Sequence, residues 1–219
     1  MKNLAGTLAI CAALWIASFA GYFWLLPVLD APDGYNDAPV AFALYYAAWV
    51  AATIVAFRRT HFAFLNADVL RKNIGPVVIV ALILYVAVTQ GIPNLPGQRI
   101  DTLAGPSEVY EAGSSFFLPK SVEIVFQQVL IVAILLALST SGLSVARMSL
   151  LVGLLFGGFH LTLLYVYAEP SFAYRYAIAA TVFGAMVPYM ILKIRHGYLL
   201  SYGIHWCFYV WLALLNKPA

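Results

Sequence analysis

Three ionisable side chains, Glu123, His160 and His205, lie within long apolar stretches of the sequence. A carboxylate can take a proton from water, and a histidine can order that water, so these residue types supply what a hydrolytic reaction needs. Ionisable groups are costly in hydrocarbon, and in membrane helices they normally face the bundle interior and mark a functional path. We therefore take these three residues as the candidate catalytic residues.

Polar neighbours one helical turn away accompany two of the three. Gln127 follows Glu123 by four residues and Tyr209 follows His205 by four, which places each pair on one helix face. At about 1.5 Å per residue, the two histidines fall near the middle of a bilayer and Glu123 lies further out. One outward-facing pocket could hold Glu123, His160 and His205 together.

Glycines cluster just before His160, at positions 153, 157 and 158. Small residues at such spacings let the backbones of membrane helices approach closely. We expect a neighbouring helix to pack tightly against this face, beside His160.

Each candidate residue also has an interpretation without chemistry. An intramembrane glutamate or histidine can simply be a satisfied hydrogen-bond partner between helices. Glu123 is near enough to the outer end of its apolar stretch to be solvated, or paired with Lys120 at the surface. The aromatic neighbours are of types that pack helices or lie at membrane interfaces, namely Phe159, Trp206, Phe208 and Tyr209.

The overall composition excludes a soluble protein. Hydrophobic residues make up 63% of the 219 and charged residues 10%, with a mean hydropathy of +0.89, whereas soluble domains are roughly half apolar and a quarter charged. Apolar runs of about twenty residues match bilayer-crossing helices and exclude an outer-membrane barrel, which is built from short alternating strands. The net charge of +3 is small and scattered, which argues against a nucleic-acid partner.

We predict an all-α membrane protein, a bundle of about seven transmembrane helices that forms one domain over residues 1–219. The expected spans are 4–26, 39–57, 75–92, 118–139, 149–167, 172–193 and 198–216. Six would remain if the first were cleaved as a signal peptide, which its long continuous apolar run disfavours. The connection from about residue 90 to 119 is interrupted by Gly and Pro, and its length is typical of a lid over a site or of a flexible connector.

Lysine and arginine indicate the orientation expected for an integral protein of a bacterial-type inner or plasma membrane. One side of the seven-span arrangement collects Lys2, Arg58, Arg59, Arg71, Lys72, Arg147, Lys193 and Arg195. The opposite side collects most of the acidic residues outside the spans. Because positively charged loops stay in the cytoplasm, we expect the amino terminus inside and the carboxyl terminus outside.

Three segments in the second half of the chain share their order and separation with the motifs of a known family. They are Val122-Glu123-Ile-Val-Phe126-Gln127, Phe156-Gly-Gly-Phe-His160 and His205-Trp-Cys-Phe-Tyr209. Together they resemble the Glu-Glu-x-x-x-Arg, Phe-x-x-x-His and His-x-x-x-Asn motifs of the CAAX protease and bacteriocin-processing family of intramembrane endopeptidases, also called the Abi family. The resemblance covers residues 118–215 and rests on the order and helical placement of the motifs.

The resemblance extends family roles only to Glu123, Phe126, His160 and His205, of which Glu123, His160 and His205 would be catalytic. The candidate supporting residues are Phe126, Gln127, Phe156 and Tyr209. In the family, paired glutamates and a histidine activate water, and the last histidine with its asparagine stabilises the oxyanion. Here Val122, Gln127 and Tyr209 replace the first glutamate, the arginine and the asparagine. A phenol hydroxyl can substitute for the asparagine as a donor. A neutral amide can hydrogen-bond Glu123 but cannot hold it ionised by charge.

Several functions remain open on the sequence alone. The first is a glutamate-dependent endopeptidase that cleaves a membrane-associated peptide or protein near the outer leaflet without a metal. The second is a catalytically degenerate relative that acts as a membrane binding or assembly subunit, which the three replacements favour. The third is a haem- or quinone-binding subunit with His160 and His205 as axial ligands. Zinc on Glu123 and the two histidines is chemically reasonable, although no His-Glu-x-x-His motif supports it.

Overall fold

The computed structural model describes residues 4–58, 112–165 and 170–215, with isolated positions between 79 and 94. Every regular element in the three continuous ranges is a helix. The long helices are α1 (Leu4–Val28), α2 (Pro39–Ala56), α6 (Phe117–Ser139), α7 (Val145–His160), α8 (Pro170–Lys193) and α9 (Gly197–Leu215). A short 3-10 helix, η3 (Ser114–Phe116), precedes α6, and another, η4 (Leu161–Tyr165), follows α7.

These helices confirm the predicted all-α class and coincide with six of the seven expected spans. The expected span at 75–92 and most of the connection at 90–119, with its lid or connector role, lie outside the described residues. Five helical segments are long and apolar enough to cross a membrane: Leu4–Val28, Pro39–Ala56, Ser114–Ser139, Val145–Tyr165 and Pro170–Lys193. The chain is therefore an integral membrane protein, and the count of seven spans stays a prediction.

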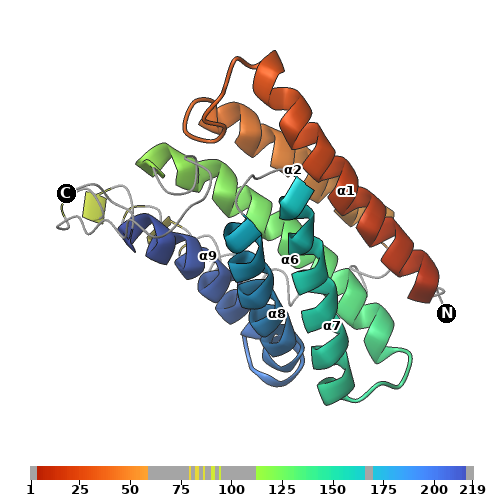
Figure 1. The fold of residues 1–219 in the computed structure, drawn as a ribbon. Helices are drawn as coiled ribbons and strands as arrows, with labels where there is room; N and C mark the ends of the chain where they lie inside the picture. Colours follow the sequence, from red (N-terminus) through yellow and green to blue (C-terminus); the bar gives the residue numbers. More distant parts are fainter. Residues whose placement is uncertain are drawn as a thin grey trace.

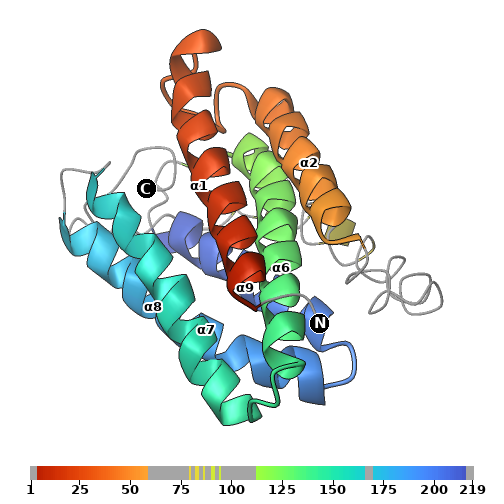
Figure 2. The same ribbon diagram turned by 90° about the vertical axis from the view of Figure 1, so that its right-hand side faces the viewer.

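Helix α6 occupies the centre of the bundle. In its most apolar stretch 67% of the residues are buried, against 17% in α1 and 17% in α2. It contacts α1 and α2 on one side and α7 and α9 on the other, while α8 packs against α7 and α9, as Figures 1 and 2 show. Glu123 thus belongs to the helix around which the others are arranged.

The contact between α7 and α8 depends on glycines. A Cβ atom at Gly153 would lie 2.9 Å from the carbonyl oxygen of Thr181, and one at Gly157 would overlap the Thr181 hydroxyl. Gly158 faces open space instead. The expected close approach therefore runs through positions 153 and 157 and not through 158. It holds the end of α7, which carries His160, against α8.

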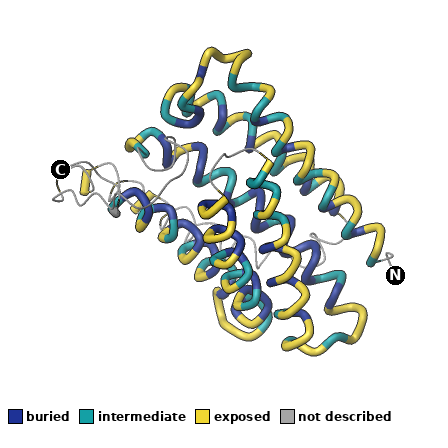
Figure 3. Tube along the Cα trace, viewed as in Figure 1, coloured by how far each residue is buried: buried dark blue, intermediate teal, exposed yellow. Residues whose placement is uncertain are grey.

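The outer faces of the bundle are apolar. Exposed side chains include Trp24, Leu44, Val55, Leu150, Ile178 and Trp211. Figure 3 shows exposed positions along the outer sides of α1, α2 and α7, whereas buried positions follow α6. Apolar exposure on this scale is unfavourable in water, and lipid chains would cover it in a bilayer.

Candidate active site

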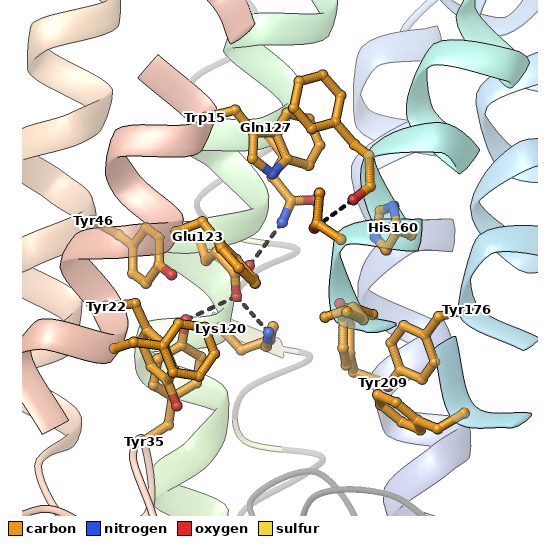
Figure 4. Close-up of a pocket in the computed structure, with 16 residues that line it drawn as sticks. Trp15, Tyr22, Tyr35, Tyr46, Lys120, Glu123, Gln127, His160, Tyr176 and Tyr209 are labelled. Carbon is orange, nitrogen blue, oxygen red and sulfur yellow. Dashed lines mark hydrogen bonds and ion pairs between the residues drawn. The ribbon is translucent and has the colours of Figure 1, made fainter. Parts of the chain in front are cut away.

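A small polar cavity lies between α6 and the ends of the surrounding helices. It has a volume of about 110 Å³, and its polar lining comes mainly from Lys120, Glu123, Gln127, His160, Tyr176 and Tyr209. Figure 4 shows the first three on α6 at one side, with His160, Tyr176 and Tyr209 across from them. A water molecule needs roughly 10–15 Å³ of such volume and two or more polar partners, so the cavity can hold more than one.

The Glu123 carboxylate receives three donors. Gln127 Nε2 donates to Oε1 at 2.8 Å, Tyr35 donates its hydroxyl to Oε2 at 3.0 Å, and the Lys120 ammonium forms an ion pair with Oε2. The Glu123 side chain is 14% exposed, so it does not face lipid. An ionised carboxylate offers about four acceptor positions. Oε1, with one donor against two on Oε2, keeps acceptor capacity toward the cavity.

The Lys120 ammonium is buried, and its partner Glu123 is partly buried. The lysine side chain is 9% exposed. Its nitrogen lies 4.3 Å from the ring centroid of Tyr209, 4.9 Å from that of Tyr35 and 5.4 Å from that of Phe116. Aromatic faces at these distances attract a cation, which partly offsets the cost of removing it from water.

Gln127 has a polar atom that needs a partner. The residue is buried, and its Oε1 atom has no hydrogen-bond partner among the described residues. A buried amide oxygen normally accepts a hydrogen bond from protein or from ordered water. Gln127 Nε2 donates to Glu123 Oε1, whereas its amide oxygen is enclosed by protein atoms. Gln127 therefore fixes one carboxylate oxygen and leaves an acceptor that no described residue binds.

His160 uses its Nδ1 atom in a contact with the protein, which leaves Nε2 as the second ring nitrogen. Its Nδ1 atom lies 2.8 Å from the carbonyl oxygen of Phe156. A carbonyl can only accept, so in the neutral ring the proton is assigned to Nδ1, and Nε2 then carries the lone pair. The ring is fixed by aromatic neighbours, with Phe156, Trp15 and Tyr176 centroids at 4.9, 6.2 and 6.4 Å. The residue can therefore accept a hydrogen bond from water at one defined atom.

His205 lines a second, apolar cavity of about 360 Å³ between α7, α8 and α9. His160, Tyr176 and Tyr209 line both cavities and form the wall between them. His205 is 6% exposed, and its Nδ1 atom has no hydrogen-bond partner in the described ranges. The rim includes three exposed apolar residues of α8 and α9, namely Val182, Met186 and Ile204. The cavity thus opens toward the region that lipid would occupy.

The structure therefore separates the three candidate catalytic residues into two adjoining cavities. Glu123 and His160 share the polar cavity, and His160 and His205 share the apolar one. The rings of His160 and His205 both contact the Phe156 ring, at 4.9 and 5.9 Å between centroids. No hydrogen bond joins Glu123 directly to either histidine in the described part of the chain. A substrate that reached all three would extend across the shared wall.

The supporting residues divide in the same way. Gln127 binds the carboxylate, and Tyr209 lies over Lys120 with its ring 5.8 Å from that of His205. Phe126 points away from both cavities and packs against Tyr46 and Trp49, each at 6.2 Å between centroids. Phe126 therefore belongs to the contact between α6 and α2, and its place in the motif reflects packing.

Two residues of the site were missed by sequence reasoning. Tyr35 comes from the connection between α1 and α2, and Tyr176 comes from the first turns of α8. Neither has a motif, and neither is distinguished from the chain's other tyrosines by its neighbours. The position of Lys120 three residues before Glu123 was a usable signal, but it indicated a surface pair, whereas the two side chains are only 9% and 14% exposed.

Metal coordination by the three candidates has no geometric support. Among the described residues, no group of three His, Cys, Asp or Glu side chains is close enough to hold a metal ion. The separation of Glu123 and His205 into different cavities is the reason that these three do not form such a group.

Comparison with protein-family models, curated proteins and solved structures finds no match for this chain. The resemblance to the CAAX protease and bacteriocin-processing family accordingly stays a prediction based on three motifs. What the chain can do must be judged from the two cavities and the residues that line them.

Proposed function

We propose that this protein is a glutamate-dependent intramembrane endopeptidase that hydrolyses a membrane-associated peptide or protein. One observation carries the proposal: Glu123 and His160, whose Nδ1 is held by the Phe156 carbonyl, line one cavity that has room for water, inside a bundle with apolar outer faces. The supporting observation is the apolar cavity that shares a wall with it. The apolar cavity suits a peptide substrate that arrives from the lipid, and the polar cavity suits the water molecule that attacks it.

The chemistry would begin with water held between Glu123 and His160. Glu123 Oε1 takes one proton as the water oxygen bonds to the carbonyl carbon of the peptide. The carbonyl π-electron pair moves to its oxygen, which becomes an oxyanion. When the tetrahedral species collapses, the carbon–nitrogen bond breaks and the leaving amine takes the proton from Glu123. The products are a carboxylic acid and an amine, and the glutamate returns to its ionised form.

Two groups of α9 are placed to stabilise the oxyanion. His205 has a buried ring nitrogen that no described residue binds, and Tyr209 carries a hydroxyl in the wall between the cavities. Donors aimed at a developing negative charge in a water-poor site are among the largest contributions to catalysis. The tyrosine would act where the family motif has an asparagine.

The apolar cavity supports a substrate with a large apolar group beside the cleaved bond. Its lining is almost entirely hydrophobic, and its rim of Val182, Met186 and Ile204 is exposed on the outer side of α8 and α9. A segment lying in the membrane could enter between these helices without crossing water. The cleaved bond would then sit at the wall formed by His160, Tyr176 and Tyr209.

The proposal includes seven spans in a bacterial-type inner or plasma membrane, with the amino terminus inside. Among the described residues, Arg147 and Lys193 lie at one end of the bundle, and Asp30, Asp33 and Asp37 lie in the connection at the other. This distribution follows the rule that positive loops remain cytoplasmic. With this orientation, the polar cavity would lie toward the outer leaflet. Reporter fusions at residues 58 and 143 should both respond as cytoplasmic.

The competing function is a binding or assembly subunit without catalysis. The observation that favours it is the binding of Glu123 by three protein donors, together with the replacements at Val122, Gln127 and Tyr209. A carboxylate in such a network could serve only to hold α6 against the loop before α2. Retained acceptor capacity on Oε1 and the adjoining volume favour the enzyme.

Cleavage of a panel of membrane peptides by the purified protein in detergent tests the proposal. Wild type is compared with E123Q, H160A and the control D30N, which removes an exposed carboxylate of the α1–α2 connection. We expect cleavage by wild type and D30N, unchanged by a chelator, and a loss of about 10² to 10⁴-fold in E123Q. Folded wild type that cleaves no peptide would favour the binding subunit. Cleavage by E123Q as fast as by wild type would reject the role of Glu123.

A further inference from the structure

Lys120 is the one permanent cation in the wall of the polar cavity, as far as the described residues show. The titratable groups that line this cavity besides Glu123 are Tyr22 of α1, Tyr35 of the α1–α2 connection, Tyr46 of α2, Lys120 of α6, His160 of α7, Tyr176 of α8 and Tyr209 of α9. Of these, only a lysine carries a full positive charge over the whole neutral range. Whatever keeps the carboxylate ionised by charge must therefore act through Lys120.

The strength of the attraction between Lys120 and Glu123 depends on how far the two side chains are removed from water. An ion pair exposed to water contributes little, because solvent screens it. Here the side chains of Lys120 and Glu123 are 9% and 14% exposed. Rings of Tyr35, Phe116 and Tyr209 surround the ammonium. A charge in such surroundings interacts much more strongly with its partner than it would at a surface.

The two sides of the carboxylate have different partners. Lys120 and Tyr35 both bind Oε2, whereas Gln127 binds Oε1. The lysine is one turn before Glu123 on α6, and the glutamine is one turn after it. The cation therefore holds the oxygen that is away from the proposed water and leaves the other oxygen to accept a proton.

We propose that Lys120 is a positioning residue that keeps Glu123 ionised and turned toward the cavity, with Gln127 contributing only a neutral hydrogen bond. This inference rests on the proposed function, and it explains how the site works with an amide at position 127. The cation is supplied from the preceding turn of α6 and is insulated by aromatic rings. Its loss would leave a carboxylate that holds a proton and cannot take one from water.

Moving the charge within the helix tests this proposal. The variants are K120M, which keeps the length and loses the charge; K120R, which keeps the charge; and K120M/Q127R, which moves the cation to the other side of Glu123. K193M, which removes an exposed lysine in the last turn of α8, is the control. We expect K120M to lower cleavage by about 10-fold to 10³-fold, the range over which an adjacent opposite charge changes the ionised fraction of a carboxylate. K120R and K120M/Q127R should recover most of it.

Infrared spectra measure the charge of Glu123 directly. Each spectrum is referenced to the same variant carrying E123Q, so that the difference reports this one carboxyl group. We expect an ionised carboxylate in wild type, K120R and K120M/Q127R, and a protonated carboxyl in K120M at the same pH. If K120M does not fold, K120Q replaces it, since it also removes the charge. An ionised Glu123 in the uncharged variant would overturn the inference.

The two readouts distinguish this inference from the proposed function. Cleavage that depends on Glu123 and is unchanged in K120M would keep the enzyme and reject the role of Lys120. The expected infrared pattern in a protein that cleaves nothing would reject the enzyme and keep the lysine as the group that ionises Glu123. A loss in K120M that the added arginine does not restore, with Glu123 ionised throughout, would show that Lys120 acts through packing alone.

Discussion

The two walls of the site are built on different principles. On one side of the polar cavity, Lys120, Glu123 and Gln127 of α6, together with Tyr35, are joined by an ion pair and hydrogen bonds, and we call this side the α6 wall. The α7–α9 wall is joined by rings, with His205 lying 4.9 Å from Phe183 and 5.9 Å from Phe156 between centroids. The α6 wall holds the Glu123 carboxylate and the Lys120 ammonium in place, and the α7–α9 wall holds aromatic rings in place around the apolar cavity.

This difference indicates which groups are set before substrate arrives. The carboxylate already has its partners and needs no rearrangement to act as a base, which is the condition for effective electrostatic catalysis. His205 lines a cavity of about 360 Å³, and its Nδ1 atom has no hydrogen-bond partner among the residues that the structure describes. In sites without substrate, catalytic hydrogen bonds are often completed only by the substrate itself. The α7–α9 wall is therefore where recognition would be completed.

Combining E123Q with H160A asks whether the two walls act as one unit. Each change alone should lower cleavage by about 10² to 10⁴-fold, because both groups handle the same water. Groups that act together are strongly non-additive. We therefore expect the double variant to be hardly slower than the slower single variant in single-turnover measurements. Losses that multiply would show that the walls act independently and that the histidine does not share the water of the glutamate.

Adding a side chain at Gly157 should disrupt the α7–α9 wall while sparing the α6 wall. Valine there would collide with Thr181 and push α7 from α8, and overpacking of this kind costs roughly 1–3 kcal/mol. We expect a lower midpoint in chemical or thermal unfolding and a loss of cleavage. The matched change is G158A, which meets open space and should be neutral or stabilise by up to about 1 kcal/mol. Equal effects at both positions would contradict the packing described here.

Filling the apolar cavity should impair recognition without touching the charge. Ala179 lines this cavity on α8 and is half-buried, so phenylalanine there would occupy volume that a substrate group needs. We expect KM to rise by about 10-fold or more with little change in kcat, since apolar pockets discriminate on this scale. The control is I178F, at an exposed position on the adjacent outer face. A fall in kcat at constant KM would place the cavity in the chemical step.

Removing the Tyr35 hydroxyl should have the smallest effect of the four. Y35F deletes one of three donors to Glu123 and leaves the ring near Lys120. We expect a loss of about 1–2 kcal/mol in unfolding free energy, somewhat above a neutral hydrogen bond because the acceptor is charged, and only a few-fold slower cleavage. Y46F, at a tyrosine that also lines the cavity, tests whether any phenol there would do as well.

Most of the fold could be predicted from apolar run length. The expected spans 39–57 and 118–139 agree with Pro39–Ala56 and Phe117–Ser139 to within a residue. The proline at position 39 marks the start of the first helix, and the polar turn after Ser139 marks the end of the second. The predicted span 149–167 begins late. Helix α7 starts at Val145 because Ser144 caps it, its hydroxyl accepting from the backbone nitrogen of Arg147.

The site could be predicted less completely than the fold. Helical periodicity placed Gln127 on the face of Glu123, and the structure confirms their hydrogen bond. Depth along the helices grouped Glu123 with the two histidines, but depth says nothing about rotation around each axis. That rotation puts His205 in the apolar cavity. Contacts between distant segments, such as Tyr35 with Glu123 over 88 positions, depend on packing that no local pattern encodes.

The reach of Tyr35 into the site affects how the chain could be divided or recombined. All three motifs lie between residues 118 and 215, which invites treating that region as a transferable module. Yet the phenol that binds Glu123 is encoded with the first pair of helices, and its ring also helps to enclose Lys120. A chimera that joined α6–α9 to a foreign helical hairpin would keep the motifs but would lack one of the donors that bind the Glu123 carboxylate. Successful exchange between related genes would have to carry the α1–α2 hairpin along with the motifs.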